Sequence, residues 1–385
     1  MEPRRLSIER LQLANFRNYE ALTLTCGPEP QVLVGANGSG KTNLIEAISL
    51  LVPGNGARGA QFRDLARAQG DGSWTVSARA HTHFGAVDLG TRFTPPRSSD
   101  ERASRIVRID GETKTGAGAL ADYLDIVWLT PAMDGLFTGP ASDRRQFLDR
   151  LIASFDSGYR TLVNSFEKAM SSRNRLLADG VTDNAQLEGF EITMAERGIA
   201  MAASRAAAVR ALTAIIDVRR AREPSSPFPW AKLEIEGPID TALKEHAAVD
   251  VEDQYQATLK RARERDRAAG RTLDGPHRSD LAVGHGPKDM PARQSSTGEQ
   301  KSLLLGLVLS HAEMIRQQHD SLAPILLLDE VSAHLDELRR AALFAEVEHL
   351  GAQAWMTGTD QSAFGALSRK ANFWTIEGAK VRAMG

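Results

Sequence analysis

The sequence predicts an α/β fold with an inserted helical lobe. Three observations carry this prediction. A glycine-rich loop lies between an apolar strand and a helix near the N-terminus, and an apolar strand that ends in two acids lies near the C-terminus. The residues between them change from alternating to helical spacing of apolar positions. The two end segments must therefore form one core while the middle of the chain forms a separate lobe.

Composition limits the kind of protein that the chain can be. Its 385 residues exceed the size of one ordinary hydrophobic core. Apolar residues make up 42% and charged residues 25%, which is a globular composition. The 47 Lys and Arg residues nearly balance the 49 Asp and Glu residues, so any nucleic-acid surface must be local.

The cysteine count and the apolar runs bear on the cell compartment. Cys26 is the only cysteine, which excludes a disulfide within the chain and a zinc site built from several cysteines. The first ten residues lack the apolar core of a signal peptide, and the apolar runs at 303–309 and 325–328 are too short to span a bilayer. We expect a cytoplasmic protein that does not contact a membrane.

The pattern along the chain divides it into three parts. Residues 1–135 alternate in polarity around the glycine-rich loop and read as a β-rich first lobe. Helical spacing dominates residues 136–271, which we expect to form an inserted helical arm lobe. Residues 272–385 return to strand signals at 325–328, 354–357 and 373–376, and complete the core.

The inserted lobe contains a long apolar stripe. Its positions are Leu187, Phe190, Met194, Met201, Val209, Leu212 and Ile216, around an alanine-rich middle. Such a stripe suits close pairing of two helices. A short paired-helix arm and an ordinary helical lobe without a protrusion fit the pattern equally well.

The glycine-rich loop matches the phosphate-binding pattern G-x-x-x-x-G-K-[ST]. Its residues are Gly35, Ala36, Asn37, Gly38, Ser39, Gly40, Lys41 and Thr42. Backbone N–H groups of such a loop and of the following helix face phosphates. Lys41 would then reach the β- and γ-phosphates of ATP, and Thr42 would bind Mg²⁺. A glycine turn that only joins a strand to a helix does not explain the Lys-Thr pair.

The second end of the site is predicted at Asp329 and Glu330. They follow the apolar run Ile325–Leu328, which is the form of a Walker B strand. Asp329 would hold Mg²⁺, and Glu330 would orient the attacking water. Alone, two acids that cap a strand are often ordinary exposed ends, but together with the loop they predict an ATPase.

Two shorter segments near Asp329 fit contacts across a dimer. Ser295–Lys301 is similar to part of an ABC-type signature, in which Ser296, Gly298 and Gln300 would meet the ATP of a second subunit at a helix N-terminus. Ser332–Asp336 similarly fits a D-loop, with Asp336 at the interface. For the signature segment, a simple helix cap is the alternative.

The chain resembles the RecF family, whose members are related to SMC heads. The resemblance rests on five segments in the same order: Asn15–Tyr19, the glycine-rich loop, Asp143–Asp149, Leu273–Asp280, and the signature-to-Walker-B block. It implies an ABC-type P-loop ATPase head that binds ATP and Mg²⁺ and dimerises on ATP. It also implies slow DNA-stimulated ATP hydrolysis and a nucleotide contact for Arg17.

The resemblance further implies a recombination mediator in DNA replication, DNA repair and the SOS response. Such a protein would bind gapped duplex or a single-/double-strand junction, and would act with RecR and RecO to load RecA at gaps or stalled forks. Gly275–Arg278 remains without a chemical role, and a tight turn is the favoured explanation.

Two segments depart from related ATPases. Leu129–Asp134 holds no glutamine and one acid where ABC proteins have a Q-loop, which puts a metal role there in doubt. Ala354–Thr359 lacks a switch histidine, so a threonine or the partner subunit would sense the γ-phosphate, and hydrolysis should be slow. A transporter-type nucleotide-binding subunit or another SMC-like head is the alternative, but a transporter subunit should carry these missing residues. A small-molecule P-loop kinase would leave the signature segment unexplained.

Basic residues in the inserted lobe are candidates for DNA contacts. They are Arg144, Arg145, Arg150, Arg160, Lys168, Arg173, Arg175, Lys260, Arg261, Arg263, Arg265, Arg267 and Arg271. Binding to phosphates requires such a surface. A solvated face is the commoner fate of charge runs, and we expect part of this set to contact DNA.

Overall fold

The computed structural model describes residues 5–96, 103–180, 184–319, 321–331, 335–367 and 370–384. The chain divides into two compact units. The core unit comprises Met1–Asp134, Glu223–Pro229 and Ser296–Gly385, and the helical unit comprises Gly135–Arg222 and Trp230–Ser295. Each unit is described by itself.

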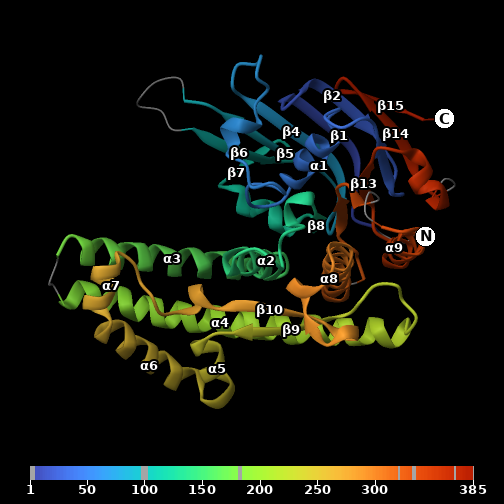
Figure 1. Ribbon diagram of the computed structural model, residues 1–385. Coiled ribbons are helices and arrows are strands. Elements are labelled where there is room, and N and C mark those ends of the chain that lie inside the picture. The colour runs from blue at the N-terminus through green and yellow to red at the C-terminus, as the bar shows by residue number, and fades with distance from the viewer. Residues whose placement is uncertain are drawn as a thin grey trace. The chain divides into compact units, whose positions relative to one another are not determined.

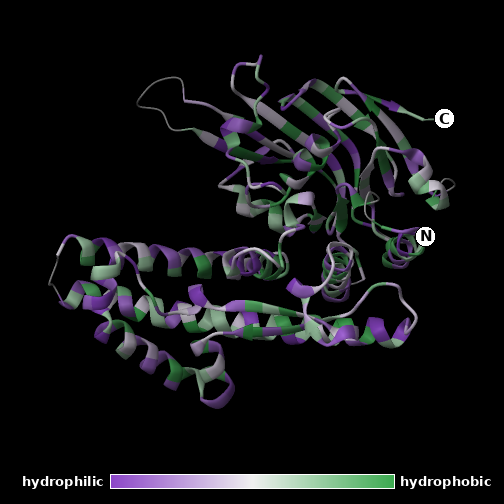
Figure 2. Cartoon of the chain, in the orientation of Figure 1, coloured by the Kyte–Doolittle hydropathy of each residue, from purple (hydrophilic) through white to green (hydrophobic). Residues whose placement is uncertain are grey.

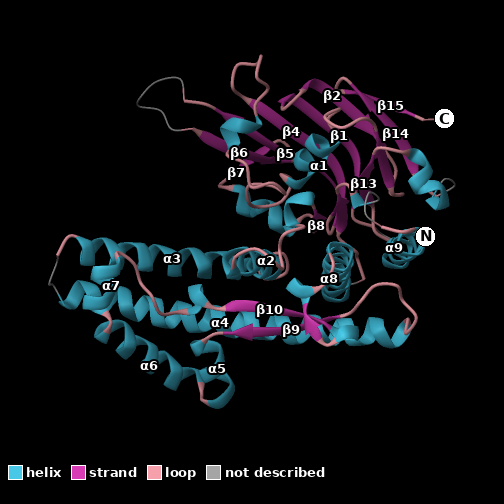
Figure 3. Cartoon of the chain, in the orientation of Figure 1, coloured by secondary structure: helices cyan, strands magenta, loops and turns pink. Residues whose placement is uncertain are grey.

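The core unit contains two six-stranded sheets (Figure 3). The first sheet is antiparallel, with strand order β2-β1-β4-β5-β6-β7. Its strands are β1 (Ser7–Phe16), β2 (Tyr19–Thr25), β4 (Trp74–Thr82), β5 (Gly85–Thr94), β6 (Ser104–Ile109) and β7 (Glu112–Lys114). Burial alternates along β4 and β5, as expected for strands that cover a core on one face. Figure 2 shows the corresponding bands of hydrophilic and hydrophobic residues.

The second sheet carries the two halves of the expected ATP site. Its order is β15-β14-β3-β13-β12-β8, and only the β14–β15 pair is antiparallel. Its strands are β3 (Gln31–Val34), β8 (Ile126–Leu129), β12 (Ile325–Leu328), β13 (Ala354–Gly358), β14 (Asn372–Glu377) and β15 (Lys380–Ala383). β3, β12 and β13 are buried throughout, as parallel strands covered on both faces are. The strands before the loop and before the acids are separated only by β13.

In the described part of the core unit, three α-helices fix the ends of its functional segments. They are α1 (Lys41–Ser49), α8 (Thr297–Gln318) and α9 (Glu337–Leu350) (Figure 1). α1 follows β3 directly through the glycine-rich loop, as the sequence predicts. α8 buries most of its residues from Gln300 to Ile315, so its first turn is held by an extensive apolar contact.

The helical unit is built around a long pair of helices. α3 (Ser157–Ala178) packs along α4 (Asn184–Arg222), in agreement with the predicted pairing (Figure 1). The other elements are α2 (Ala141–Ala153), β9 (Ala231–Glu236), α5 (Pro238–Glu245), α6 (Ala248–Arg261), α7 (Arg263–Ala269), β10 (Asp280–His285) and β11 (Met290–Pro291). α4 also packs against α6 and β9. The pair is therefore covered on one side by the rest of the unit.

α4 is long and apolar enough to cross a membrane by length and composition. Half of its most apolar window is buried inside the unit, and one such helix is weak evidence for a membrane span. The sequence prediction that the runs at 303–309 and 325–328 are the longest apolar ones thus overlooked α4, whose apolar residues are separated by alanines and charged residues.

The first unit boundary lies one residue from the one expected at 135, whereas the second differs from the one expected at 271. The helical unit continues to Ser295, because β10 pairs antiparallel with β9 and keeps the chain in that unit. Glu223–Pro229 belongs instead to the core unit, where Arg339 donates a 3.4 Å hydrogen bond to the carbonyl of Pro227. Short pairings between distant strands leave no compositional signal at a boundary.

Candidate functional site

The glycine-rich loop makes a tight turn between β3 and α1. Gly40 has φ of 120°, and a Cβ there would lie 2.7 Å from the hydroxyl of Tyr19 and from Nδ2 of Asn18. At Gly35 a Cβ would lie 2.3 Å from the carbonyl oxygen of Ile376. Side chains are therefore excluded at both ends of the loop, which leaves its backbone free to approach phosphates.

Residues Arg17 to Tyr19 support this loop from behind. Asn18 donates to the carbonyl of Ser39 at 3.2 Å, and Tyr19 donates to the carbonyl of Gly40 at 3.1 Å. Arg17 donates to both carboxylate oxygens of Glu46 on α1, at 2.8 and 3.0 Å, and to the carbonyl of Asp64. The guanidinium of Arg17 is therefore already bound to a buried carboxylate. Its expected contact with a nucleotide stays a prediction.

Lys41 lies within the loop. Its ammonium donates to the carbonyls of Gly35 and Ala36, at 2.6 and 2.9 Å. Burial lowers the pKa of Lys41, and the charges of Glu330 and Asp329 oppose that shift. A phosphate in the loop would offer the ammonium stronger acceptors than these carbonyls.

Asp329 and Thr42 approach each other at the end of β12. The Thr42 hydroxyl donates to Oδ1 of Asp329 at 3.2 Å, and the hydroxyl of Thr357 donates to the same oxygen at 2.7 Å. Oδ2 of Asp329 is buried and has no hydrogen-bond partner among the described residues. Burial raises the pKa of Asp329, and the negative charge of Glu330 adds to that rise.

This arrangement fits a bound Mg²⁺ ion. A buried carboxylate oxygen without a partner is costly unless a cation or a donor reaches it. Asp329 and Thr42 offer oxygen ligands, which Mg²⁺ prefers. Asp329 and Thr42 are therefore suitable ligands for Mg²⁺.

Glu330 follows Asp329 with an unusual backbone. Its φ is 53°, and its N–H donates to the hydroxyl of Thr357 at 2.7 Å while its side chain is exposed. Thr357 is fully buried on β13. The sequence predicts that a threonine of Ala354–Thr359 or the partner subunit senses the γ-phosphate. In the structure Thr357 fixes two consecutive acids, a role that no local sequence pattern indicates.

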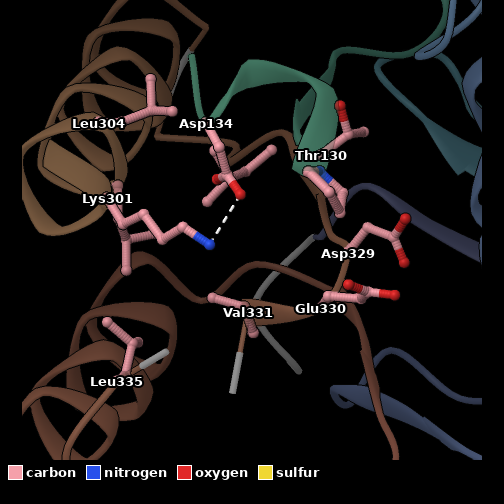
Figure 4. Close-up of a pocket in the computed structure, with 11 residues that line it drawn as sticks. Thr130, Asp134, Lys301, Leu304, Asp329, Glu330, Val331 and Leu335 are labelled. Atoms are coloured by element: carbon pink, nitrogen blue, oxygen red, sulfur yellow. Dashed lines mark ion pairs between the residues drawn. The ribbon is translucent and has the colours of Figure 1, made fainter. Parts of the chain in front are cut away.

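A pocket lies beside the two acids (Figure 4). Its lining includes Thr130 from the end of β8, both acids, and Lys301 from the first turns of α8. Asp134, the only acid of the Leu129–Asp134 segment, forms a 2.7 Å ion pair with Lys301. The sequence analysis did not single out Lys301, which joins the signature segment to the loop after β8.

The signature segment begins α8. Ser296 caps the helix by accepting from the N–H of Glu299 at 3.4 Å, and the Glu299 carboxylate accepts from the N–H of Ser296 at 3.1 Å. A Cβ at Gly298 would meet nothing within 4 Å, whereas Gln300 is buried. The helix-cap interpretation thus holds for Ser296, and Gly298 leaves the helix start open to an approaching group.

The expected D-loop is only partly described. Ser332, Ala333 and His334 lie outside the described residues. Asp336 caps α9 by accepting from the N–H of Arg339 at 2.8 Å, and its carboxylate pairs with the Arg339 guanidinium. In the described part of the chain, no hydrogen bond joins Ser296, Gly298 or Asp336 to Lys41, Thr42, Asp329 or Glu330. Within one chain, the predicted site residues thus form two groups. Lys41, Thr42, Asp329 and Glu330 lie together, whereas Ser296, Gly298 and Asp336 are not hydrogen-bonded to them.

Many of the basic DNA candidates in the helical unit are held by acids or carbonyls. Arg173 is fully buried and binds Glu191, Asp266 and Thr272. Arg263 binds both oxygens of Glu191. Further pairs and contacts join Arg144 to Asp280, Arg145 to the carbonyl of Ser279, Lys260 to Glu188, Arg265 to Asp274, and Arg267 to the carbonyl of Leu177. These residues stabilise the unit, so the charge run overstated the available basic surface.

Exposed basic residues without such partners are fewer. They include Lys168, Arg175, Arg261 and Arg271, which form no ion pair with another residue that the structure describes. The segment Gly275–Arg278 is a tight turn, with φ of 141° at Gly275, and the carbonyl of Pro276 accepts from Arg205. The predicted turn is thus present.

Comparison with known proteins identifies relatives over nearly the full chain. The family model of the RecF/RecN/SMC N-terminal domain matches residues 7–372. The DNA replication and repair protein RecF of Mesorhizobium japonicum is 50% identical over 376 residues, with 97% of each chain covered. The RecF of Brucella suis is 49% identical over 381 residues, covering 98% of this chain and 97% of the relative.

Solved structures show a similar fold. The recombination mediator protein RecF-ATPrS of the RecFOR pathway has a TM-score of 0.85 at 23% identity, with 99% of both chains covered. The Smc head domain of Pyrococcus furiosus bound to the C-terminal domain of ScpA has a TM-score of 0.55 at 19% identity, with 99% of this chain and 96% of that chain covered. The α/β head with a helical insertion is therefore shared with both.

Proposed function

This chain belongs to the RecF family, and on that basis we propose that it is an ATP-gated, DNA-binding recombination mediator. The observation that carries the ATP part is the meeting of Thr42 and Asp329 beside Lys41 and Glu330. Membership of the RecF family argues against the alternative that the chain is a transporter-type nucleotide-binding subunit.

ATP binding is assigned to the glycine-rich loop. Backbone N–H groups of residues 35–42 would bind the phosphates, and Lys41 would exchange the carbonyls of Gly35 and Ala36 for β- and γ-phosphate oxygens. Thr42 and Asp329 would hold Mg²⁺, which neutralises charge on the phosphates when bound. Asn18 and Tyr19 keep the loop in shape by binding its carbonyls.

Hydrolysis is assigned to Glu330. Its carboxylate would orient water for attack, while the hydroxyl of Thr357 fixes the backbone that carries it. No histidine stands in β13, and the hydroxyl of Thr357 is already bound to Asp329. A sensor of the γ-phosphate would therefore come from elsewhere, which supports slow turnover. That DNA raises this turnover is proposed from the family alone.

A homodimer would complete each ATP site. Ser296, Gly298, Gln300 and Asp336 are proposed to act on the nucleotide of the opposite subunit. The open space above Gly298 supports this, because a helix start with no side chain over it can approach a phosphate. ATP would then hold two chains together, and hydrolysis would release them.

The partners follow from the relatives. We propose that the closed dimer binds gapped duplex or a single-/double-strand junction in the cytoplasm, and acts with RecR and RecO to load RecA. The exposed residues Lys168, Arg175, Arg261 and Arg271 are the proposed phosphate contacts on the helical unit.

The test is DNA binding with and without nucleotide. Fluorescence anisotropy of a labelled gapped duplex should rise with ATP and stay low with ADP or no nucleotide. The Lys41→Ala protein is the matched control and should not respond to ATP. Equal binding in all nucleotide states, or a normal ATP response of Lys41→Ala, would contradict an ATP-gated mediator.

A further inference from the structure

Two histidines and an aspartate meet at one place in the core unit, away from the P-loop. His83 lies in the two-residue turn between β4 and β5, Asp125 directly precedes β8, and His319 is the C-cap of α8. The three residues come from distant parts of the chain. Their approach is therefore a product of the fold and is invisible in sequence spacing.

The donor atoms converge on one oxygen. Nε2 of His83 lies 3.0 Å from Oδ2 of Asp125, and Nδ1 of His319 lies 2.6 Å from the same oxygen. One ligand atom from each residue lies within 4.8 Å of the other two. The rings are perpendicular, with centroids 4.9 Å apart, so their nitrogens approach from different directions.

The surroundings of the cluster hold it in place. Asp125 is buried, and its backbone carbonyl accepts from the N–H of Ile325 at 2.9 Å. The His83 turn is fixed by the hydroxyl of Thr82, which donates to the carbonyl of Gly85 and accepts from the N–H of Phe84. Both rings remain partly exposed, at 19% for His83 and 29% for His319. Water can therefore reach the side of the cluster that the protein does not cover.

We propose that His83, Asp125 and His319 form a binding site for a divalent transition-metal ion of the zinc class. Imidazole nitrogen and carboxylate oxygen are the ligands that such ions take at about 2.0–2.2 Å. Donors around a tetrahedral ion would then lie about 3.3 Å apart, and Oδ2 of Asp125 already lies 3.0 and 2.6 Å from the two ring nitrogens. Three protein ligands with an exposed side leave the fourth position to water.

The position of the cluster at the C-terminal end of α8 favours the binding of a cation. The last carbonyls of a helix carry partial negative charge and favour positive charge beside them. His319 ends α8, and Asp125 adds a buried carboxylate.

The site would act as a brace rather than in ATP chemistry. It would tie the β4–β5 turn and the start of β8 to the end of α8, the helix that Ser296 caps. The competing account is a hydrogen-bonded His–Asp–His cluster that needs no metal. The two accounts differ in whether added metal binds and stabilises the chain.

The experiment uses the full chain, stripped of metal by a chelator, and Zn²⁺ alone as the probe. Isothermal titration should give one Zn²⁺ per chain, and Zn²⁺ should raise the unfolding temperature. Asp125→Asn and His319→Gln keep the size of the side chains but replace ligands, and each should weaken Zn²⁺ binding at least tenfold. Co²⁺ should give a visible absorption band in the wild type that Zn²⁺ removes.

Two controls separate this site from others. His81→Gln changes an exposed histidine at the end of β4 and should bind Zn²⁺ like the wild type. Asp329→Asn removes the carboxylate expected to bind Mg²⁺ and should also leave Zn²⁺ affinity unchanged. The proposal is overturned if the wild type shows no stoichiometric Zn²⁺ binding and no Co²⁺ band. It is equally overturned if folded Asp125→Asn and His319→Gln bind Zn²⁺ as tightly as His81→Gln.

Discussion

The hydroxyl of Thr357 donates a 2.7 Å hydrogen bond to Oδ1 of Asp329. The same hydroxyl accepts from the N–H of Glu330 at 2.7 Å. One buried side chain on β13 therefore orients both acids at the end of β12, in the left-handed backbone that Glu330 adopts. The neighbouring strand β13, rather than β12 itself, therefore fixes the geometry of the two acids.

Thr357→Val should disturb both acids. Valine has the shape of threonine but leaves the N–H of Glu330 without its partner, so the free energy of unfolding should fall by about 1–3 kcal/mol. ATP affinity in Mg²⁺ should also fall, because Asp329 loses a fixed position. Thr357→Ser keeps the hydroxyl and should stay near the wild type in urea unfolding and ATP titration. A loss in Thr357→Ser with none in Thr357→Val would show that the methyl group, not the hydroxyl, matters.

Lys41→Ala should abolish ATP-dependent dimerisation. The β- and γ-phosphates would lose their main cationic contact. Light scattering with ATP should then report a monomer, while the wild type shifts to twice its mass. If Lys41→Ala shows the same ATP-dependent mass shift as the wild type, Lys41 is not the main cationic contact of the β- and γ-phosphates.

Glu330→Gln and Ser296→Arg should fail at different stages. Glu330→Gln removes the charge that orients water, so ATP should still close the dimer while turnover falls by roughly 10²-fold or more. Ser296→Arg places bulk at the exposed start of α8, so it should block dimerisation and leave ATP binding by the single chain intact. ATP affinity, dimer fraction and turnover are measured side by side. Normal turnover in the first variant, or normal dimerisation in the second, would rule out a site shared by two subunits.

Asp329→Asn should change how stability depends on pH. Burial raises the pKa of Asp329 above its ordinary value of about 3.9. Between these two values the folded chain binds the proton more tightly than the unfolded chain, so the contribution of this group to stability falls as pH rises. The stability of Asp329→Asn relative to the wild type should therefore increase from about pH 4 upward and then level off. Urea unfolding across pH without nucleotide tests this, and a difference that does not vary with pH would contradict it.

Charge reversal at Lys168, Arg175, Arg261 and Arg271 should weaken DNA binding. Each lost phosphate contact should reduce the slope of log affinity against log salt by about one. Arg263 is unsuitable for this test, because its reversal would leave the buried Glu191 poorly paired. Arg210→Glu, an exposed change on α4 outside the candidate set, is the control. Unchanged affinity and slope in the fourfold variant would make these side chains a solvated face.

The sequence predicted the parts of the core that depend on local pattern. The strand at 325–328, the loop at 35–42 and the helix after it lie where alternation and glycine spacing put them. The role of Thr357 was not predictable, because it depends on β13 lying beside β12. The fate of Arg173 was missed for a similar reason, since its acidic partner Asp266 is far along the chain. Local spacing reports which residues are present but not which of them meet.

The strand order of the second sheet has a consequence for how the chain is made. β3 pairs only with β13 and β14, which are among the last strands to leave the ribosome, whereas β1, β2, β4 and β5 find their partners early. During translation the buried residues of β3 remain unpaired until almost the whole chain has been synthesised. Such distant pairing is slow and exposes apolar surface to aggregation. A truncated translation product would therefore carry a complete glycine-rich loop that no sheet supports.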